Sequence, residues 1–137
     1  MVGPTITRPS TYCPTSVVPN GTCPAGTQTV FANGGSALDV EVPGGQQVYI
    51  APSGLLTYTR AHSSSYPPGS QFGGFGALDG EYVITSPAGQ GWLACPSSQV
   101  AQAYQIYADR AGHPDGCTDI TLLLHSYTGP FAAWQYT

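Results

Sequence analysis

The fold of this chain is decided by the stretch LDVEVPGGQQVYIAPSGLLTYTR, residues 38–60. From 38 to 42 apolar residues alternate with acids, which predicts a half-buried strand with an acidic outer face. Pro43-Gly44-Gly45 forms a tight turn into a second run, and Pro52-Ser53-Gly54 forms a turn into a third. Because each run is short and each turn is tight, the stretch predicts two successive hairpins.

Outside this stretch, short runs with strand composition continue along the chain, with Gly and Pro between them. The runs cover residues 81–85, 91–95, 103–109, 118–127 and 131–136. Residues 99–107 also contain good helix formers, so one or two helical turns are the alternative there. With about eight to ten short strands, the chain is predicted to be all-β, a single-domain antiparallel β-sandwich or barrel.

The first 27 residues have a different composition, with prolines at positions 4, 9, 14, 19 and 24. Proline lacks an amide proton and fixes φ, so this spacing excludes helix and any interior strand. We therefore predict a Pro/Thr-rich extended arm over residues 1–27, pinned by a disulfide, and a β domain over residues 28–137.

The predicted core consists of the apolar members of the alternating runs. They are Val40, Val42, Val48, Ile50, Leu56, Tyr58, Ile84, Leu93, Ile106, Ile120, Leu122 and Leu124. A chain of 137 residues is long enough to bury such a core, so disulfides add stability to a domain that does not depend on them alone.

Four cysteines point to the compartment of the protein. Cys13, Cys23, Cys95 and Cys117 are even in number, and none lies in a Cys-x-x-Cys spacing typical of zinc or redox sites. Asn20-Gly21-Thr22 is an N-glycosylation sequon. With no lysine and many hydroxyl residues, these features predict a secreted protein. The favoured pairing is Cys13–Cys23 with Cys95–Cys117, because both loops are local; a nested pairing between the arm and the C-terminal half is the alternative.

The charge excludes two classes of partner. A net charge of −4 and three scattered arginines provide no basic stripe for nucleic acid, and they disfavour anionic membrane surfaces. No apolar run approaches the roughly 20 residues of a bilayer-spanning helix, so membrane insertion is not expected. The residues from Met1 lack the regions of a signal peptide, so we expect a mature form to which Met1 was added.

We predict no catalytic, metal or cofactor site. No serine lies in a Gly-x-Ser-x-Gly elbow. Asp79 and Glu81, about 7 Å apart along a strand, are the best carboxylate pair for glycoside hydrolysis, so a small carbohydrate-active enzyme is the opposing alternative. The segment from His113 to Cys117 has metal-ligand residue types, but its Pro-Asp-Gly is a turn sequence and a disulfide-bonded Cys117 cannot bind metal.

The predicted binding surface lies on residues 61–80, a Gly/Ser/Pro-rich stretch that is long for a connection in a compact domain. Binding is assigned to its aromatic residues and to two neighbouring polar residues, because glycines allow close approach and aromatic rings supply contact area. These residues are Arg60, His62, Tyr66, Phe72 and Phe75. The alternative is that Phe72 and Phe75 fold back and cap one end of the β domain.

Three stretches together resemble a known family. They are Asn20-Gly21-Thr22-Cys23, the segment 46–59, and Trp92-Leu93-Ala94-Cys95-Pro96 followed by residues 104–109 and Gly116-Cys117. In order and spacing they are similar to the small secreted cell-wall proteins of filamentous fungi typified by the phialide-formation (PhiA-type) protein, across residues 17–125. The resemblance implies secretion, wall association, glycosylation and no enzymatic activity. It assigns no catalytic residue; Asn20 carries over as a glycan position and the cysteines as disulfide positions.

Two parts of the chain depart from the family, the Pro/Thr-rich arm with Cys13 and the loop 61–80. We therefore expect a secreted protein that acts by binding a cell-wall glycan or a host extracellular protein, without catalysis. The runner-up is a virulence effector that inhibits a host extracellular hydrolase such as a papain-like cysteine protease. Gln46-Gln47-Val48-Tyr49 begins like the inhibitory wedge of cystatins, although Ile50 stands where that wedge has glycine.

Overall fold

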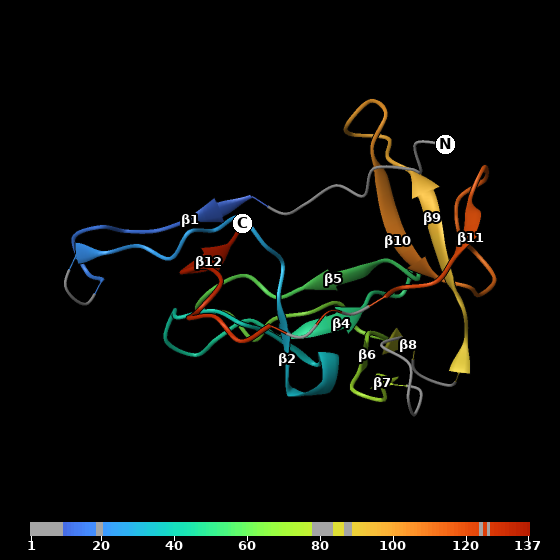
Figure 1. Cartoon of the computed structure of the whole chain (residues 1–137). Coiled ribbons are helices and arrows are strands. Elements are labelled where there is room, and N and C mark those ends of the chain that lie inside the picture. Colours follow the sequence, from blue (N-terminus) through green and yellow to red (C-terminus); the bar gives the residue numbers. More distant parts are fainter. Residues whose placement is uncertain (1–9, 19–20, 78–83, 87–88, 124, 126) are drawn as a thin grey trace.

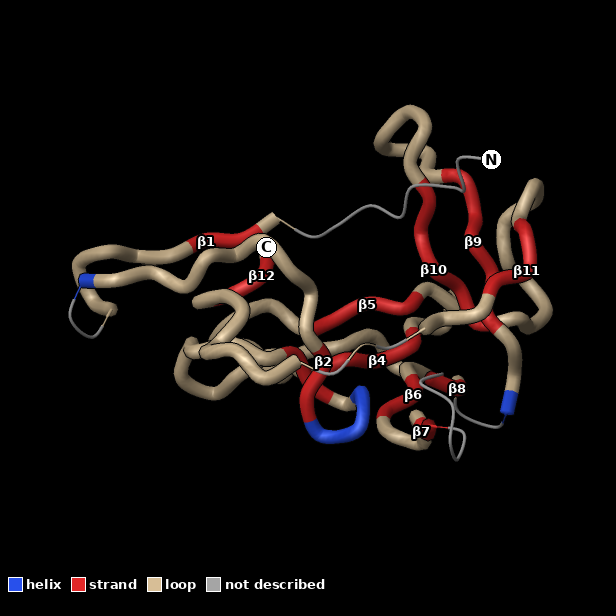
Figure 2. Tube along the Cα trace, viewed as in Figure 1, coloured by secondary structure: helices blue, strands red, loops and turns tan. Residues whose placement is uncertain are grey.

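A computed structural model of the chain describes residues 10–18, 21–77, 84–86, 89–123, 125 and 127–137. Apart from 3₁₀ turns such as η2 (Asn33–Gly35), the regular elements in these residues are strands, which form five small antiparallel sheets (Figures 1 and 2). The predicted all-β, antiparallel fold is confirmed. Across the described ranges, no helix has the length and hydropathy that a membrane span requires.

One three-stranded sheet contains the second of the predicted hairpins. β4 (Val48–Ile50) and β5 (Leu56–Tyr58) pair with Tyr49 opposite Thr57. Their turn is closed by a hydrogen bond of 2.8 Å from Gly54 N to Ala51 O, and Gly54 has a φ of 93°, a conformation that glycine adopts without strain. This hairpin is confirmed by the structure.

The strand that precedes this hairpin is shorter than predicted. β3 (Ala37–Leu38) pairs with β2 (Phe31–Ala32), and it ends before the expected limit at residue 42. Val40 forms a parallel bridge with Ala133 instead, because the C-terminal segment lies alongside residues 40–42 and accepts their amide hydrogen bonds.

The loop 61–80 contributes strands that its composition does not predict. β6 (Gln71–Phe72) pairs with the edge of β4 that β5 leaves open, so the order of this sheet is β5-β4-β6. β7 (Gly76–Ala77) pairs with β8 (Ile84–Thr85). The open edge of β4 supplies hydrogen-bond partners that a Gly/Ser-rich sequence can use as well as any other.

The second three-stranded sheet has the order β10-β9-β11. β9 (Trp92–Pro96) lies between β10 (Tyr104–Ala108) and β11 (Thr118–Ile120). The helical alternative for residues 99–107 is wrong, because β10 pairs with β9 along its whole length. The strand predicted over residues 118–127 ends at Ile120.

The described residues of the N-terminal arm lie against the C-terminal strand. β1 (Thr11–Tyr12) pairs with β12 (Gln135–Tyr136), and Val18 is buried in the core (Figure 1). The Cys13–Cys23 disulfide follows β1 directly and closes the loop that contains Val18. The arm over residues 1–27 therefore packs on the β domain through the part that is described.

The core has two clusters of buried side chains. The first contains Val18, Leu38, Val40, Val42, Val48, Ala133, Trp134 and Tyr136, and the second contains Ile50, Trp92 and Ala108. Of the predicted core, Val40, Val42, Val48, Ile50 and Leu93 are buried, whereas Leu56, Tyr58, Ile106, Ile120 and Leu122 are half-buried against one of the clusters. The side chains of Ile84 and Leu124 lie outside the described part of the chain.

Alternation does not identify the largest core residues. The side chains from Trp92 to Cys95 are all buried, because β9 is the central strand of its sheet and is covered on both faces. Trp134 and Tyr136 are buried by contact with residues nearly a hundred positions earlier in the chain. The pattern of residues around positions 134 and 136 therefore does not predict their burial.

Candidate functional site

A groove of about 580 Å³ lies between the edge strands β5 and β10. At one end the two strands are joined by a hydrogen bond of 2.9 Å from Ala108 N to Gly54 O and by a bridge between Leu55 and Tyr107. Beyond this junction the sheets no longer pair, and the space between them is the β5–β10 groove. It is lined by Thr29, Phe31, Leu38, Val48, Leu55, Leu56, Thr57, Tyr58, Gln99, Tyr104, Gln105, Ile106 and Thr137.

The lining of the groove is uncharged. Aromatic rings come from Phe31, Tyr58 and Tyr104, and amides come from Gln99 and Gln105. Threonines add hydroxyl groups, and among the residues that the structure describes no acidic or basic side chain belongs to the lining. The groove can therefore provide ring surfaces and neutral hydrogen-bond donors and acceptors, but no charge for an ionic ligand.

The rim of the groove at Gln99 is shaped by the turn between β9 and β10. Ser97 Oγ accepts hydrogen bonds of 3.2 Å from the amides of Gln99 and Val100, and Ser97 N donates to Ala103 O at 2.9 Å. A serine that caps amides two and three residues ahead is a common way to fold a tight turn. This local structure places Gln99 beside Tyr104 at the groove.

Tyr58 joins the groove to the core. Its hydroxyl donates to the backbone oxygen of Thr137 at 3.0 Å, and its ring lies edge-on to Tyr136 with centroids 6.1 Å apart. Burial, and secondarily the neighbouring Tyr136, raises the pKa of Tyr58 above its ordinary value of 10.0. The folded protein therefore favours the neutral phenol.

This pKa shift predicts a loss of stability in alkali. A raised pKa in the folded state contributes stability that is fully present below pH 10.0 and is lost as the pH rises through the higher folded value. We therefore expect the urea midpoint of the protein to fall as the pH rises above 10.0, and to fall less in Tyr58→Phe. Equal slopes in the two proteins would contradict the prediction, whatever their difference near neutral pH.

The aromatic residues predicted to bind a partner are divided between two places. Tyr66 and Phe72 pack edge-to-face with ring centroids 4.0 Å apart, and both rings contact Tyr49 on the outer face of β4. Tyr66 is 47% exposed, so this Tyr66 surface (Tyr49, Tyr66 and Phe72) is open to solvent at its outermost ring. Arg60 and His62 are exposed at the start of the same loop.

Phe75 lies elsewhere. Its ring stacks on Trp92 with centroids 6.3 Å apart and planes 5° apart, and it packs against both core clusters. Phe72 is also half-buried. Only Phe75 of the two packs against the core clusters, as the capping alternative describes, and the binding role of the loop stays a prediction.

Arg110 holds the loop against the rest of the domain, a role that the sequence does not indicate. Its guanidinium donates to Gln71 Oε1 at 2.9 Å, to Pro52 O at 2.9 Å and to Ala51 O. These bonds connect the end of β10 to β6 and to the β4–β5 turn. Arg110 thereby fixes the closed end of the β5–β10 groove.

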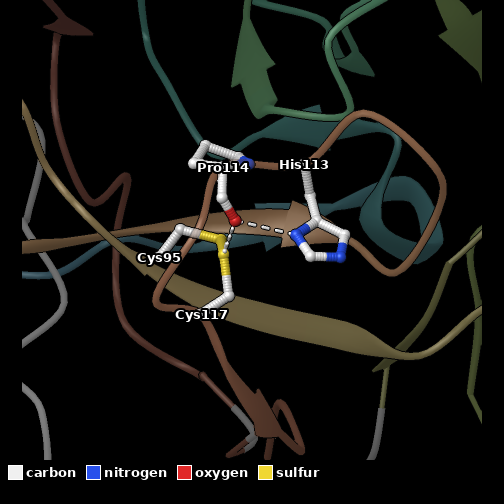
Figure 3. The surroundings of a disulfide bond; sticks show 4 residues. All are labelled: Cys95, His113, Pro114 and Cys117. Carbon is white, nitrogen blue, oxygen red and sulfur yellow. Dashed lines mark hydrogen bonds between the residues drawn. A yellow bond between two sulfur atoms is a disulfide. The ribbon is translucent and has the colours of Figure 1, made fainter.

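The predicted disulfide pairing is confirmed. Cys13 bonds to Cys23, and Cys95 bonds to Cys117. Thr118 lies opposite Ala94 in the β9–β11 register, so Cys117 lies opposite Cys95 and the second bond crosses between adjacent strands. Figure 3 shows Pro114 O beside this disulfide, 2.8 Å from Cys117 Sγ and accepting a hydrogen bond of 2.8 Å from His113 Nδ1. Because its sulfur is bonded to Cys95, Cys117 has no thiolate to offer a metal.

Other predicted positions lie outside the described residues or in the core. Asn20 belongs to the undescribed residues 19–20, and the Asp79–Glu81 pair belongs to the undescribed residues 78–83. The cystatin-like segment is internal, since Gln46, Val48 and Tyr49 are all buried. Among the described residues, no group of three or more His, Cys, Asp or Glu side chains is placed to hold a metal ion.

Comparison with known proteins places the chain in a family. The model of the PhiA-like secreted protein family matches residues 8–137. The chain is also 39% identical over 141 residues to an uncharacterized secreted protein of Arthroderma benhamiae, an alignment that covers 94% of this chain and 70% of the relative. No solved structure matches the chain. The resemblance drawn from three short motifs is thereby confirmed over nearly the whole length, and this secreted fungal protein belongs to the PhiA-like secreted protein family.

Proposed function

We propose that this secreted protein binds a neutral glycan of the fungal cell wall in the β5–β10 groove, without catalysing a reaction. The observation that carries the proposal is the chemistry of the groove, in which aromatic rings, amides and hydroxyls surround about 580 Å³ and none of the described lining residues has a charged side chain. Ligand sites of this size are typically apolar with a few convergent polar groups.

Each part of the lining suits a sugar chain. The apolar C–H face of a sugar ring packs on an aromatic ring such as Tyr104, while sugar hydroxyls exchange hydrogen bonds with side chains such as Gln99 and Gln105. An ionic polymer would lose its hydration in the groove and gain no opposite charge. A neutral polysaccharide is therefore the best match among wall components.

Binding without catalysis is supported by the position of the acids. Glycoside hydrolysis requires two carboxyl side chains on either side of the scissile bond, and no Asp or Glu belongs to the groove lining among the described residues. Asp39, a described acid near the core, accepts a hydrogen bond of 3.1 Å from Ala132 N and holds the C-terminal segment instead.

Inhibition of a host protease is the second function expected from the sequence, and it has less support. An inhibitory hairpin must enter the cleft of the enzyme, whereas Gln46 and Val48 are each only 2% exposed. Presenting that segment to an enzyme would require β4 to separate from its neighbours in the sheet β5-β4-β6. Inhibition of a host protease is therefore one of the outcomes that the test below distinguishes.

The test is sedimentation of the purified protein with insoluble neutral wall polysaccharides, followed by calorimetry with soluble fragments. We expect Tyr104→Ala to weaken binding by about fivefold or more, because a stacked ring contributes on the order of 1 kcal/mol or more. Tyr66→Ala is the matched control, since it removes an exposed tyrosine that lies outside the groove.

Three results would contradict the proposal. The first is the absence of binding to any neutral wall polysaccharide. The second is loss of binding in Tyr66→Ala with full binding in Tyr104→Ala, which would move the site to the Tyr66 surface. The third is inhibition of a purified papain-like protease by the wild type at concentrations where no glycan binds.

A further inference from the structure

We infer that the β5–β10 groove recognises acetamido groups, so that its ligand is a glycan of N-acetylated amino sugars. This inference rests on the proposed function and names the class of sugar. It comes from the backbone of the two groove walls, whose hydrogen-bonding groups are directed by the sheet registers.

Both walls of the groove are edge strands. β5 is the outer strand of the sheet β5-β4-β6, and β10 is the outer strand of the sheet β10-β9-β11. Each strand therefore uses one side of its backbone for its own sheet and turns the other side toward the groove. Which residues turn their groups toward the groove follows from the alternation of an antiparallel ladder.

On β5, alternation directs the backbone groups of Leu56 and Tyr58 away from β4, and Tyr58 is the one farther from the Leu55–Tyr107 bridge. Ala51 N donates to Leu55 O and Thr59 N donates to Gln47 O, each at 2.9 Å, so these two pairs are hydrogen-bonded pairs of the ladder. By alternation the pair Val48–Tyr58 is not hydrogen-bonded. The N–H and C=O of Tyr58 point away from β4, on the side of β10.

On β10, Tyr104 and Ile106 have the corresponding orientation, and Tyr104 is the one farther from the Leu55–Tyr107 bridge. Ser97 N donates to Ala103 O and Asp109 N donates to Gly91 O, each at 2.9 Å. The pair Pro96–Tyr104 is therefore not hydrogen-bonded, and the backbone groups of Tyr104 point away from β9. The backbone groups of Ala108 point to the same side of β10 as those of Tyr104. Ala108 donates its N–H to Gly54 O in the β4–β5 turn, so this side of β10 faces β5.

The two tyrosines thus place a backbone N–H and C=O on each wall of the groove beyond the Leu55–Tyr107 bridge. Backbone groups at a sheet edge need hydrogen-bond partners outside their own sheet, and a ligand in the groove can supply them. An acetamido group carries one N–H and one C=O in the geometry of a peptide, so it matches such a wall better than a hydroxyl does. Its methyl group can contact the apolar side chains of Leu56 and Ile106, which also line the groove.

The extent of the open backbone favours a sugar over a peptide strand. A peptide that adds to a sheet edge pairs over several residues. Here the junction at Gly54 and Leu55 already occupies one end of the groove, which leaves a short pair of walls flanked by rings. No acidic side chain belongs to the described part of the lining, which disfavours deacetylated, cationic amino sugars.

The experiment compares the binding of three unlabelled oligomers of equal length to the full chain with both disulfides intact. They are an N-acetylglucosamine oligomer, its deacetylated glucosamine counterpart and a β-linked glucose oligomer, titrated by calorimetry and by amide NMR. We expect the N-acetylated oligomer to bind about tenfold more tightly than either other oligomer, because the groove hydrogen-bonds one acetamido group that the other two lack. The largest amide shifts are expected at Tyr58 and Tyr104.

A pair of variants at Tyr104 separates the ring from the backbone. Tyr104→Ala removes the ring and keeps the N–H, whereas Tyr104→Pro removes both at an edge position where proline is tolerated. We expect Tyr104→Pro to bind the N-acetylated oligomer about fivefold more weakly than Tyr104→Ala. Melting temperatures identify a variant that fails to fold, in which case the amide shifts of the wild type decide the question.

The outcomes distinguish this inference from the proposed function. Equal or tighter binding of the glucose oligomer would overturn the acetamido inference and leave glycan binding in place. Binding of no oligomer would overturn both. Amide shifts confined to residues 61–72, or tighter binding of an uncharged extended peptide than of every oligomer, would also overturn the inference.

Discussion

Replacing Gln46 by Leu is expected to lower the free energy of unfolding by about 3–5 kcal/mol, because three buried backbone groups lose their partners. Gln46 is 2% exposed, and its side chain Nε2 donates to Thr59 O and to Tyr136 O at 2.9 Å each. Its Oε1 accepts from Tyr136 N at 2.7 Å. One amide thereby connects the end of β5 to the C-terminal strand, and leucine has a similar size but none of these bonds.

The measurement is urea unfolding at neutral pH with both disulfides intact. Gln47→Leu is the matched control, because Gln47 is the exposed neighbour of the same residue type, and we expect it to change stability by less than about 0.5 kcal/mol. A loss of under about 1 kcal/mol in Gln46→Leu would show that the amide is not the connection between the two strands.

The second large effect is expected at Phe75. Phe75→Ala should cost about 3 kcal/mol, at the lower end of the usual range for removing a core phenylalanine because the ring is half-buried. The variant loses the stacking on Trp92 and the contacts to both core clusters. Thermal or urea unfolding measures the loss.

The control for Phe75 is Tyr66→Ala, the aromatic residue of the same loop that is 47% exposed. We expect it to cost less than about 1 kcal/mol, since much of its surface already contacts water. If Phe75→Ala were neutral and Tyr66→Ala strongly destabilising, the assignment of the inward and outward rings would be reversed. The two variants therefore separate the capping role from the binding role that residues 61–80 were predicted to have.

Parts of the candidate site could be predicted from the sequence. The runs that become β5 and β10 are recognisable as strands, and their tyrosines belong to those runs. The groove itself is not recognisable, because Tyr58 and Tyr104 are 46 residues apart and meet through the junction of two sheets. A loop rich in glycine and aromatic residues suggested the site instead, since loop composition is visible locally and the meeting of two sheet edges is not.

The sequence by itself determined the features that depend on neighbouring residues. Alternation and turn residues locate the β4–β5 hairpin and the runs that become β9 and β10, and short separations favour the disulfides Cys13–Cys23 and Cys95–Cys117. Only the tertiary structure decided which faces are covered. Gln46 is buried because β12 lies against it, and the groove exists because two sheets join at one end and separate at the other. Burial and the meeting of sheet edges arise from contacts between distant segments, and no local pattern of residues encodes such contacts.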